Sequence, residues 1–133
     1  KDPSQIFIAN TDGTNLIQIT NNDTNNWSPK VSPDGNHVVF VSDRDGNREI
    51  YTMDIDGSNE KRMTFNHVDD WDPDWSNDGN KLIFSSDNSD GFSDIYQINK
   101  DGTGIKKIIN NGIQASTVRK LNKFSLEKLD DRK

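Results

Sequence analysis

Short runs in which apolar and polar residues alternate recur along this chain. Residues 37–42 (HVVFVS), 49–55 (EIYTMDI) and 61–64 (KRMT) each predict a strand, and residues 30–32 predict a shorter one. Asp-Gly pairs separate these runs. Such pairs favour tight hairpin turns, because glycine accepts the positive φ angles that the turns require. Residues 29–64 are therefore predicted to form one four-stranded antiparallel sheet.

The whole pattern then repeats after 44 or 45 residues. Trp27 recurs as Trp71, and Asp56 recurs as Asp101. A period of about 40–45 residues with four strands per unit is typical of a β-propeller blade. The chain is therefore predicted to be all-β and to contain about two and a half four-stranded blades.

The repeat divides residues 1–111 into three parts. We expect a half blade at residues 5–20, a full blade at 27–65 and a second full blade at 71–110. The strands expected in the second full blade are residues 74–76, 81–86, 94–99 and 105–109.

The segment 112–133 does not continue the repeat. It has no Asp-Gly pair, and its net charge is +3, whereas residues 1–111 carry −9. A domain boundary is therefore expected at residue 112. The apolar spacing permits two closing strands and also permits a helix, and a disordered basic tail is the third alternative.

Composition limits the classes of function. Only 29% of the residues are hydrophobic, which alone would suggest disorder, but their regular placement favours a folded protein. Because the chain has no cysteine, disulfides, zinc–thiolate sites and thiol chemistry are excluded. The negative net charge argues against nucleic-acid binding. No apolar run is long enough to span a membrane, no signal peptide is present, and the first residue is Lys1, so we expect a processed or excised chain.

The segment PKVSPDGNHVVFVSDRDGNREIYTMDIDGSNEKRMT closely resembles the PD40 (WD40-like) repeat of TolB-type β-propellers. The features that carry the resemblance are the Ser-Pro-Asp-Gly turn, the Phe-x-Ser strand, the Ile-Tyr strand that ends in Asp-Gly, and the closing Thr. Val31 stands where the family pattern has Trp, and Asn77 stands where it has Pro.

The resemblance implies a non-enzymatic, extracytoplasmic (periplasmic or secreted) scaffold that binds a partner protein at the propeller face. It also leaves an alternative open, because related blades occur in the propeller portions of prolyl-oligopeptidase-type peptidases and of acidic-sugar lyases. The fold alone does not distinguish the scaffold from the propeller portion of an enzyme. No cofactor is expected from the resemblance.

One connector differs strongly between the copies. His67, Asp69, Asp70 and Asp72 occupy the positions of Asp23, Asn25, Asn26 and Ser28. Carboxylate oxygens are hard ligands and the His67 imidazole is a borderline one, so these four residues are candidates for a cation site that would take Ca²⁺ or Mn²⁺. The alternative is an acidic, solvated rim.

We expect no catalytic residues in this chain. It contains none of the nucleophile-elbow, zinc-protease or phosphate-loop motifs. His37 aligns with Lys81 and is predicted to be exposed and solvated. The Asp-Gly pairs lack the spacing of an EF-hand and are predicted to be turn formers. We expect the repeated aromatic side chains to pack between blades: Trp27, Trp71, Trp75, Phe40, Phe84, Tyr51 and Tyr96.

A family ring of six or seven blades needs more than this chain contains. Two chains of about three blades each would make a six-bladed ring, with residues 113–129 of one chain pairing with residues 5–20 of the other. The alternative is that the chain is a piece of a longer propeller.

Overall fold

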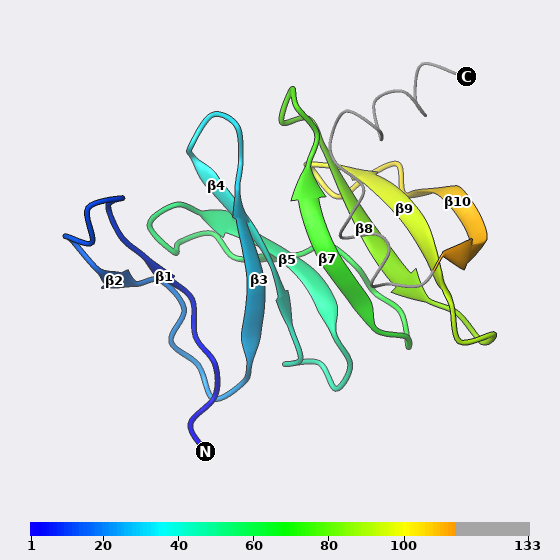
Figure 1. The fold of residues 1–133 in the computed structure, drawn as a ribbon, viewed down its shortest axis with the longest axis horizontal. Coiled ribbons are helices and arrows are strands. Elements are labelled where there is room, and N and C mark those ends of the chain that lie inside the picture. Colours follow the sequence, from blue (N-terminus) through cyan, green and yellow to red (C-terminus); the bar gives the residue numbers. More distant parts are fainter. Residues whose placement is uncertain (114–133) are drawn as a thin grey trace.

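The protein, in a computed structural model that describes residues 1–113, is built from ten β-strands over that range. They are β1 (Phe7–Ile8), β2 (Ile17–Gln18), β3 (Asn26–Val31), β4 (His37–Ser42), β5 (Glu49–Asp54), β6 (Lys61–Arg62), β7 (Asp70–Trp75), β8 (Lys81–Asp87), β9 (Ser93–Asn99) and β10 (Lys106–Ile113). They form one two-stranded sheet and two four-stranded sheets, which follow one another across the molecule (Figure 1). No helix in this described part is long and apolar enough to cross a membrane.

Both four-stranded sheets are antiparallel, and their strands neighbour one another in chain order. Phe40 lies opposite Tyr51 in the first sheet, and Phe84 lies opposite Tyr96 in the second. The two ring pairs stack with centroids 5.7 and 5.8 Å apart. The predicted four-stranded blade is therefore confirmed, and the two full blades are close copies.

The Asp-Gly pairs form the turns predicted for them. Gly57 has a φ of 88°, and the Asp56 carboxylate accepts a hydrogen bond from the backbone N–H of Ser58 at 2.9 Å. The Ser58 hydroxyl and, after it, this backbone contact lower the pKa of Asp56, because they stabilise its charged form. The pKa is lowered in the same way at Asp12, Asp34, Asp78 and Asp101.

The inner strand of each full blade begins four residues earlier than predicted. β3 starts at Asn26 and not at residue 30, and β7 starts at Asp70 and not at residue 74. In each strand the register shifts at a bulge, where Ser28 and Asp72 have positive φ angles of 51° and 47°. A bulge breaks the alternation of apolar and polar positions, which is why the sequence pattern missed this part of the strand.

The blades stack through both faces of the middle sheet. On β4, Val38 and Phe40 pack with Ile6 and Ile19 of the half blade, whereas Val39 and Val41 pack on the other side. Burying such side chains contributes about 1.5–3 kcal/mol each, so a single blade needs its neighbours. We call the contact between the half blade and the first full blade the first boundary. The contact between the two full blades is the second boundary.

The aromatic residues expected between blades follow this arrangement with one exception. Four of the seven pack in the cores of the two boundaries, namely Phe40, Tyr51, Trp75 and Phe84, and Tyr96 packs against the second core. Trp27 packs against the edge of the second core. Trp71 instead lies against the guanidinium of Arg48, whose Cζ is 4.0 Å from its ring centroid.

The last strand is longer than the predicted strand at residues 105–109. β10 ends at Ile113, so the boundary expected at residue 112 falls inside a strand. The predictions for the rest of the segment 112–133, closing strands or disorder, concern residues 114–133 and lie outside the described residues.

Candidate functional site

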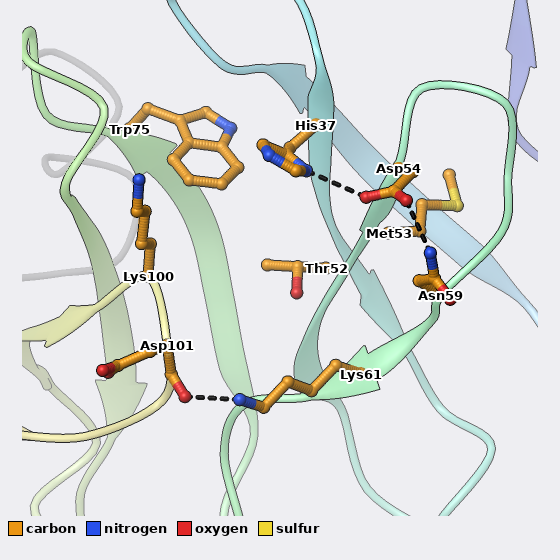
Figure 2. Close-up of a pocket in the computed structure, with 9 residues that line it drawn as sticks. All are labelled: His37, Thr52, Met53, Asp54, Asn59, Lys61, Trp75, Lys100 and Asp101. Atoms are coloured by element: carbon orange, nitrogen blue, oxygen red, sulfur yellow. Dashed lines mark hydrogen bonds and ion pairs between the residues drawn. The ribbon is translucent and has the colours of Figure 1, made fainter.

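A pocket of about 290 Å³ opens at the second boundary, beside the turns that follow β5 and β9 (Figure 2). The first full blade and the second full blade each supply part of its wall. The lining residues are His37, Thr52, Met53, Asp54, Asn59, Lys61, Trp75, Lys100 and Asp101.

His37 is held in a fixed position on one wall of this pocket. Its ring Nδ1 lies 3.0 Å from Oδ1 of Asp54, and Asn59 donates a hydrogen bond to the other Asp54 oxygen at 2.7 Å. The imidazole also faces the indole of Trp75, with ring centroids 6.3 Å apart. The prediction of a solvated His37 was therefore incomplete: the side chain is 43% exposed, but it is paired.

Trp75 forms a rigid part of the opposite wall. Its side chain is buried, and its Nε1–H donates a hydrogen bond to the backbone carbonyl of Lys30 at 3.0 Å. This bond ties the inner strands β7 and β3 together across the boundary. The pocket is thus bordered by an aromatic side chain that cannot easily move.

Two lysines supply positive charge. The Lys61 ammonium reaches across the boundary and donates to the backbone carbonyl of Asp101. Lys100 extends from the turn after β9 towards Trp75 (Figure 2). Within residues 1–113, the Lys100 ammonium has no hydrogen-bond or ion-pair partner.

The first boundary is built differently at the equivalent positions. By the repeat spacing, Thr52, Lys61, Trp75 and Lys100 correspond to Ile8, Ile17, Val31 and Ile55. At the first boundary Gly57 lies so close to Ile19 that a Cβ on Gly57 would be 2.4 Å from the Ile19 carbonyl oxygen. At the second boundary a Cβ on the equivalent Gly102 would meet only side-chain ends, Lys61 at 3.4 Å and Met63 at 3.8 Å. The second boundary thus has polar side chains and open space where the first has apolar side chains and a close approach to the backbone.

The acidic connector does not assemble as a cluster of ligands. Among residues 1–113, no group of three or more His, Asp or Glu side chains is arranged to hold a metal ion. His67 is exposed, and Asp69 forms an ion pair with Arg48 at 2.8 Å. Asp72 has the same positive-φ conformation as Ser28. The cation hypothesis stays a prediction, but the geometry does not favour it.

The fold uses these acidic positions in the same way as their neutral counterparts. The backbone N–H of Arg48 donates to Asp69 at 2.8 Å, and that of Ser4 donates to Asn25 at 3.0 Å. The role recurs, while the side chain changes from an amide to a carboxylate.

Asp70 is the most unusual of the four candidates. It is fully buried close to Glu49, which is also fully buried. Asn66 donates to its Oδ2 at 2.8 Å, but Oδ1 has no hydrogen-bond partner in the described part of the chain. Burial raises the pKa of Asp70 to about 6, the Glu49 charge adds to the rise, and polar neighbours such as Thr64 partly offset it.

Glu49, in contrast, has many donors. Its Oε1 accepts hydrogen bonds from Asn47, from the backbone of Asn66 and from Arg62, at 2.8, 3.1 and 3.2 Å. Its Oε2 accepts one from the Thr64 hydroxyl. Both carboxylate oxygens of Glu49 thus have hydrogen-bond donors, whereas Asp70 keeps one oxygen without a donor among the described residues.

The chain matches a known protein family. The family model of the PD40 TolB β-propeller domain matches residues 1–123. The chain belongs to the TolB β-propeller family. The match continues past residue 111, where the recognisable repeat ends.

Solved structures of TolB proteins have the same fold. The putative TolB from Agrobacterium tumefaciens is 28% identical with a TM-score of 0.70, over 77% of this chain and 40% of its own. TolB from Acinetobacter baumannii is 25% identical with a TM-score of 0.70, over 81% of this chain and 27% of its own. The tricorn protease is 28% identical with a TM-score of 0.61, over 81% of this chain and 10% of its own. The matched region is therefore less than half of each of these proteins.

Sequence analysis did not find the pocket residues His37, Lys61 and Lys100. A signal was available, because Lys61 and Lys100 replace isoleucines at equivalent positions of the repeat. The difference between the repeat copies was interpreted only at the connector that contains His67, Asp69, Asp70 and Asp72. His37 has no counterpart in the half blade, so the repeat could not have identified it.

Proposed function

We propose that this chain acts as a TolB-like, non-enzymatic scaffold that binds a partner protein in an extracytoplasmic compartment. One observation carries the proposal: the two blade boundaries share their apolar cores, yet the second has Thr52, Lys61 and Lys100 around an open pocket where the repeat places isoleucines at the first. Residues that the fold does not need at that place are available for a ligand. The similarity to two TolB proteins supports a binding role.

A homodimer that closes a six-bladed ring remains part of this proposal. Large apolar side chains are exposed on the half blade at Phe7, Leu16 and Ile17, and near the last strand at Ile105. Exposed apolar edges are features that folded proteins usually cover. The competing proposal is that further blades of a longer chain cover them. Light scattering at micromolar concentration separates the two, since a dimer mass supports the ring and a well-folded monomer contradicts it.

The binding role is tested by site-specific crosslinking in the native host. A photoreactive amino acid replaces Thr52 in the pocket, and a matched control carries it at Gln18, an exposed strand position on the half blade. A partner protein that is crosslinked from the Thr52 position, and that binds the purified chain with measurable affinity, is the expected result. Equal crosslinking from both positions to unrelated proteins would contradict the proposal.

The second candidate function is the propeller portion of a larger enzyme. The match to the tricorn protease favours it, because identity there equals that to one of the TolB proteins. Peptide hydrolysis by the natural full-length polypeptide, measured with fluorogenic peptides, would support this candidate. An inactive polypeptide that still binds its partner would support the scaffold.

A further inference from the structure

We propose that the pocket at the second boundary binds a carboxylate group presented by an acidic segment of the partner protein. This inference rests on the proposed scaffold function and names the chemistry of its ligand.

The charge in the pocket differs from that of the chain. The protein as a whole has a net charge of −6, yet Lys61 and Lys100 both line this pocket. The one carboxylate directed into it, Asp54, is already hydrogen-bonded to His37 and Asn59. The carboxylate of Asp101 is turned away, where Thr103 donates to it at 2.9 and 2.6 Å (Figure 2). The pKa of Asp101 is lowered mainly by Thr103 and further by the Lys61 charge, so Lys61 is partly balanced and Lys100 supplies most of the positive charge that is available to a ligand.

The lysines also have hydrogen-bond donors to spare. An ammonium group has three N–H donors, and Lys61 uses one on the Asp101 carbonyl. Lys100 uses none within the described residues. Hydrogen bonds between an ammonium and a carboxylate are stronger than neutral ones, so an anionic oxygen is the ligand that best completes this pair.

The pocket shape selects a side chain on a segment and not a folded surface. The open pocket of about 290 Å³ lies between two blades, with the Trp75 indole on one side and Met53 on the other. These apolar groups can cover the methylene groups of an aspartate or glutamate. In the first boundary the corresponding residues are Ile8, Ile17 and Ile55, which offer no such donors. The lysines are therefore not required for blades to stack.

The test uses the full chain and a fluorescein-labelled peptide of alternating Glu and Gly residues. A peptide with Gln in place of Glu is the neutral control. The double variant Lys61→Gln with Lys100→Gln removes the pocket charge. The matched variant Lys1→Gln with Lys30→Gln removes the same net charge from exposed lysines outside the pocket.

Fluorescence anisotropy should show that the Glu peptide binds more tightly than the Gln peptide. Binding should weaken about three- to tenfold in the pocket variant and stay unchanged in the matched variant. Amide resonances of Thr52 and Lys100 should shift with the Glu peptide. Lys61→Arg with Lys100→Arg should keep most of the affinity, since the charge is retained.

Equal weakening in both Gln variants, or equal binding of the two peptides, would overturn the inference. If the double variant does not fold, Lys100→Gln alone gives the same test, because the Lys100 ammonium has no partner among residues 1–113 whose loss would unfold the chain. A crosslinked partner protein that binds the wild type and the pocket variant equally would leave the scaffold function standing and overturn this inference alone.

Discussion

The two blade boundaries have the same arrangement of strands but different side chains. At both, a threonine hydroxyl accepts a backbone N–H: Thr20 from Ile6 at 2.8 Å, and Thr64 from Ile50 at 2.9 Å. Next to this shared bond, the first boundary has the neutral pair Gln5 and Asn26, with the Asn26 amide donating to Gln5 at 3.3 Å. The second boundary has two buried acids at these positions. The threonine bond lies within the blade that precedes each boundary, and the apolar strand faces are shared, whereas the polar pair that spans the boundary differs.

The boundaries also differ in how closely the backbones approach. At the first, the Asp-Gly turn of the next blade lies against the chain at Ile19. At the second, a long side chain, Lys61, fills the equivalent place and leaves a pocket beside it. A contact between backbones cannot adapt to a larger residue, whereas a flexible side chain can move aside. This difference leads to the largest predicted effect.

Gly57→Ala should destabilise the chain by about 3–4 kcal/mol, because the new Cβ would collide with a backbone carbonyl and Gly57 has a positive φ. Gly102→Ala should cost only about 1–2 kcal/mol, since its φ is the same but its neighbour is the mobile end of Lys61. Urea denaturation followed by tryptophan fluorescence measures both. Equal losses for the two variants would show that the boundaries are equally tight.

Asp70→Asn gives the second boundary the residue found at Asn26, and it should stabilise the chain at high pH. The pKa of Asp70 in the folded chain, about 6, is above its ordinary value of 3.8. The folded chain therefore holds a proton that the unfolded chain has lost between about pH 4 and 6. Stability from this group is lost as pH rises through that window, and the full cost is present at pH 8. Asp70→Asn removes the cost and should gain about 1–3 kcal/mol at pH 8 and almost nothing at pH 4.

Asp56→Asn is the control with the opposite sign. The pKa of Asp56 is lowered by Ser58, so its contribution is present at neutral pH and is lost as the pH falls through the lowered pKa. The variant should therefore be less stable than the wild type at pH 7 and equal to it at low pH. Thermal melts from pH 3 to pH 8 compare the three proteins. A wild type that gains no stability relative to Asp70→Asn on acidification would contradict the cost assigned to Asp70.

Local chemistry explains what the sequence could predict. The turns depend on glycine conformation, and the strands depend on alternation, so both were found from single segments. The bulges at Ser28 and Asp72 were missed because they break that alternation. The pairing of His37 with Asp54 and the burial of Glu49 beside Asp70 depend on how strands lie across a sheet and between blades. Such contacts need the register and the stacking, which no single segment contains.

The smallest predicted effect concerns Arg48, which has Ser4 as its counterpart at the first boundary. The Arg48 guanidinium lies between Trp27 and Trp71, with Cζ 5.2 and 4.0 Å from the ring centroids, and it pairs with Asp69 at 2.8 Å. Arg48→Ser should cost about 1 kcal/mol, because the ion pair is partly exposed and the stacking is modest. The backbone bond to Asp69 should survive, as the equivalent bond does at Ser4.

Arg48→Lys separates the contribution of the ion pair from that of the aromatic stacking. It keeps the charge for Asp69 but loses the planar group that stacks between the two indoles. Salt at about 0.5 M should screen the ion pair and leave the stacking. The difference in unfolding free energy between wild type and Arg48→Lys should therefore persist. The difference between Arg48→Lys and Arg48→Ser should become smaller. Urea denaturation at low and high salt measures both differences. If salt removed both differences together, the aromatic contacts would add nothing to stability, and Arg48 would differ from its counterpart Ser4 through its charge alone.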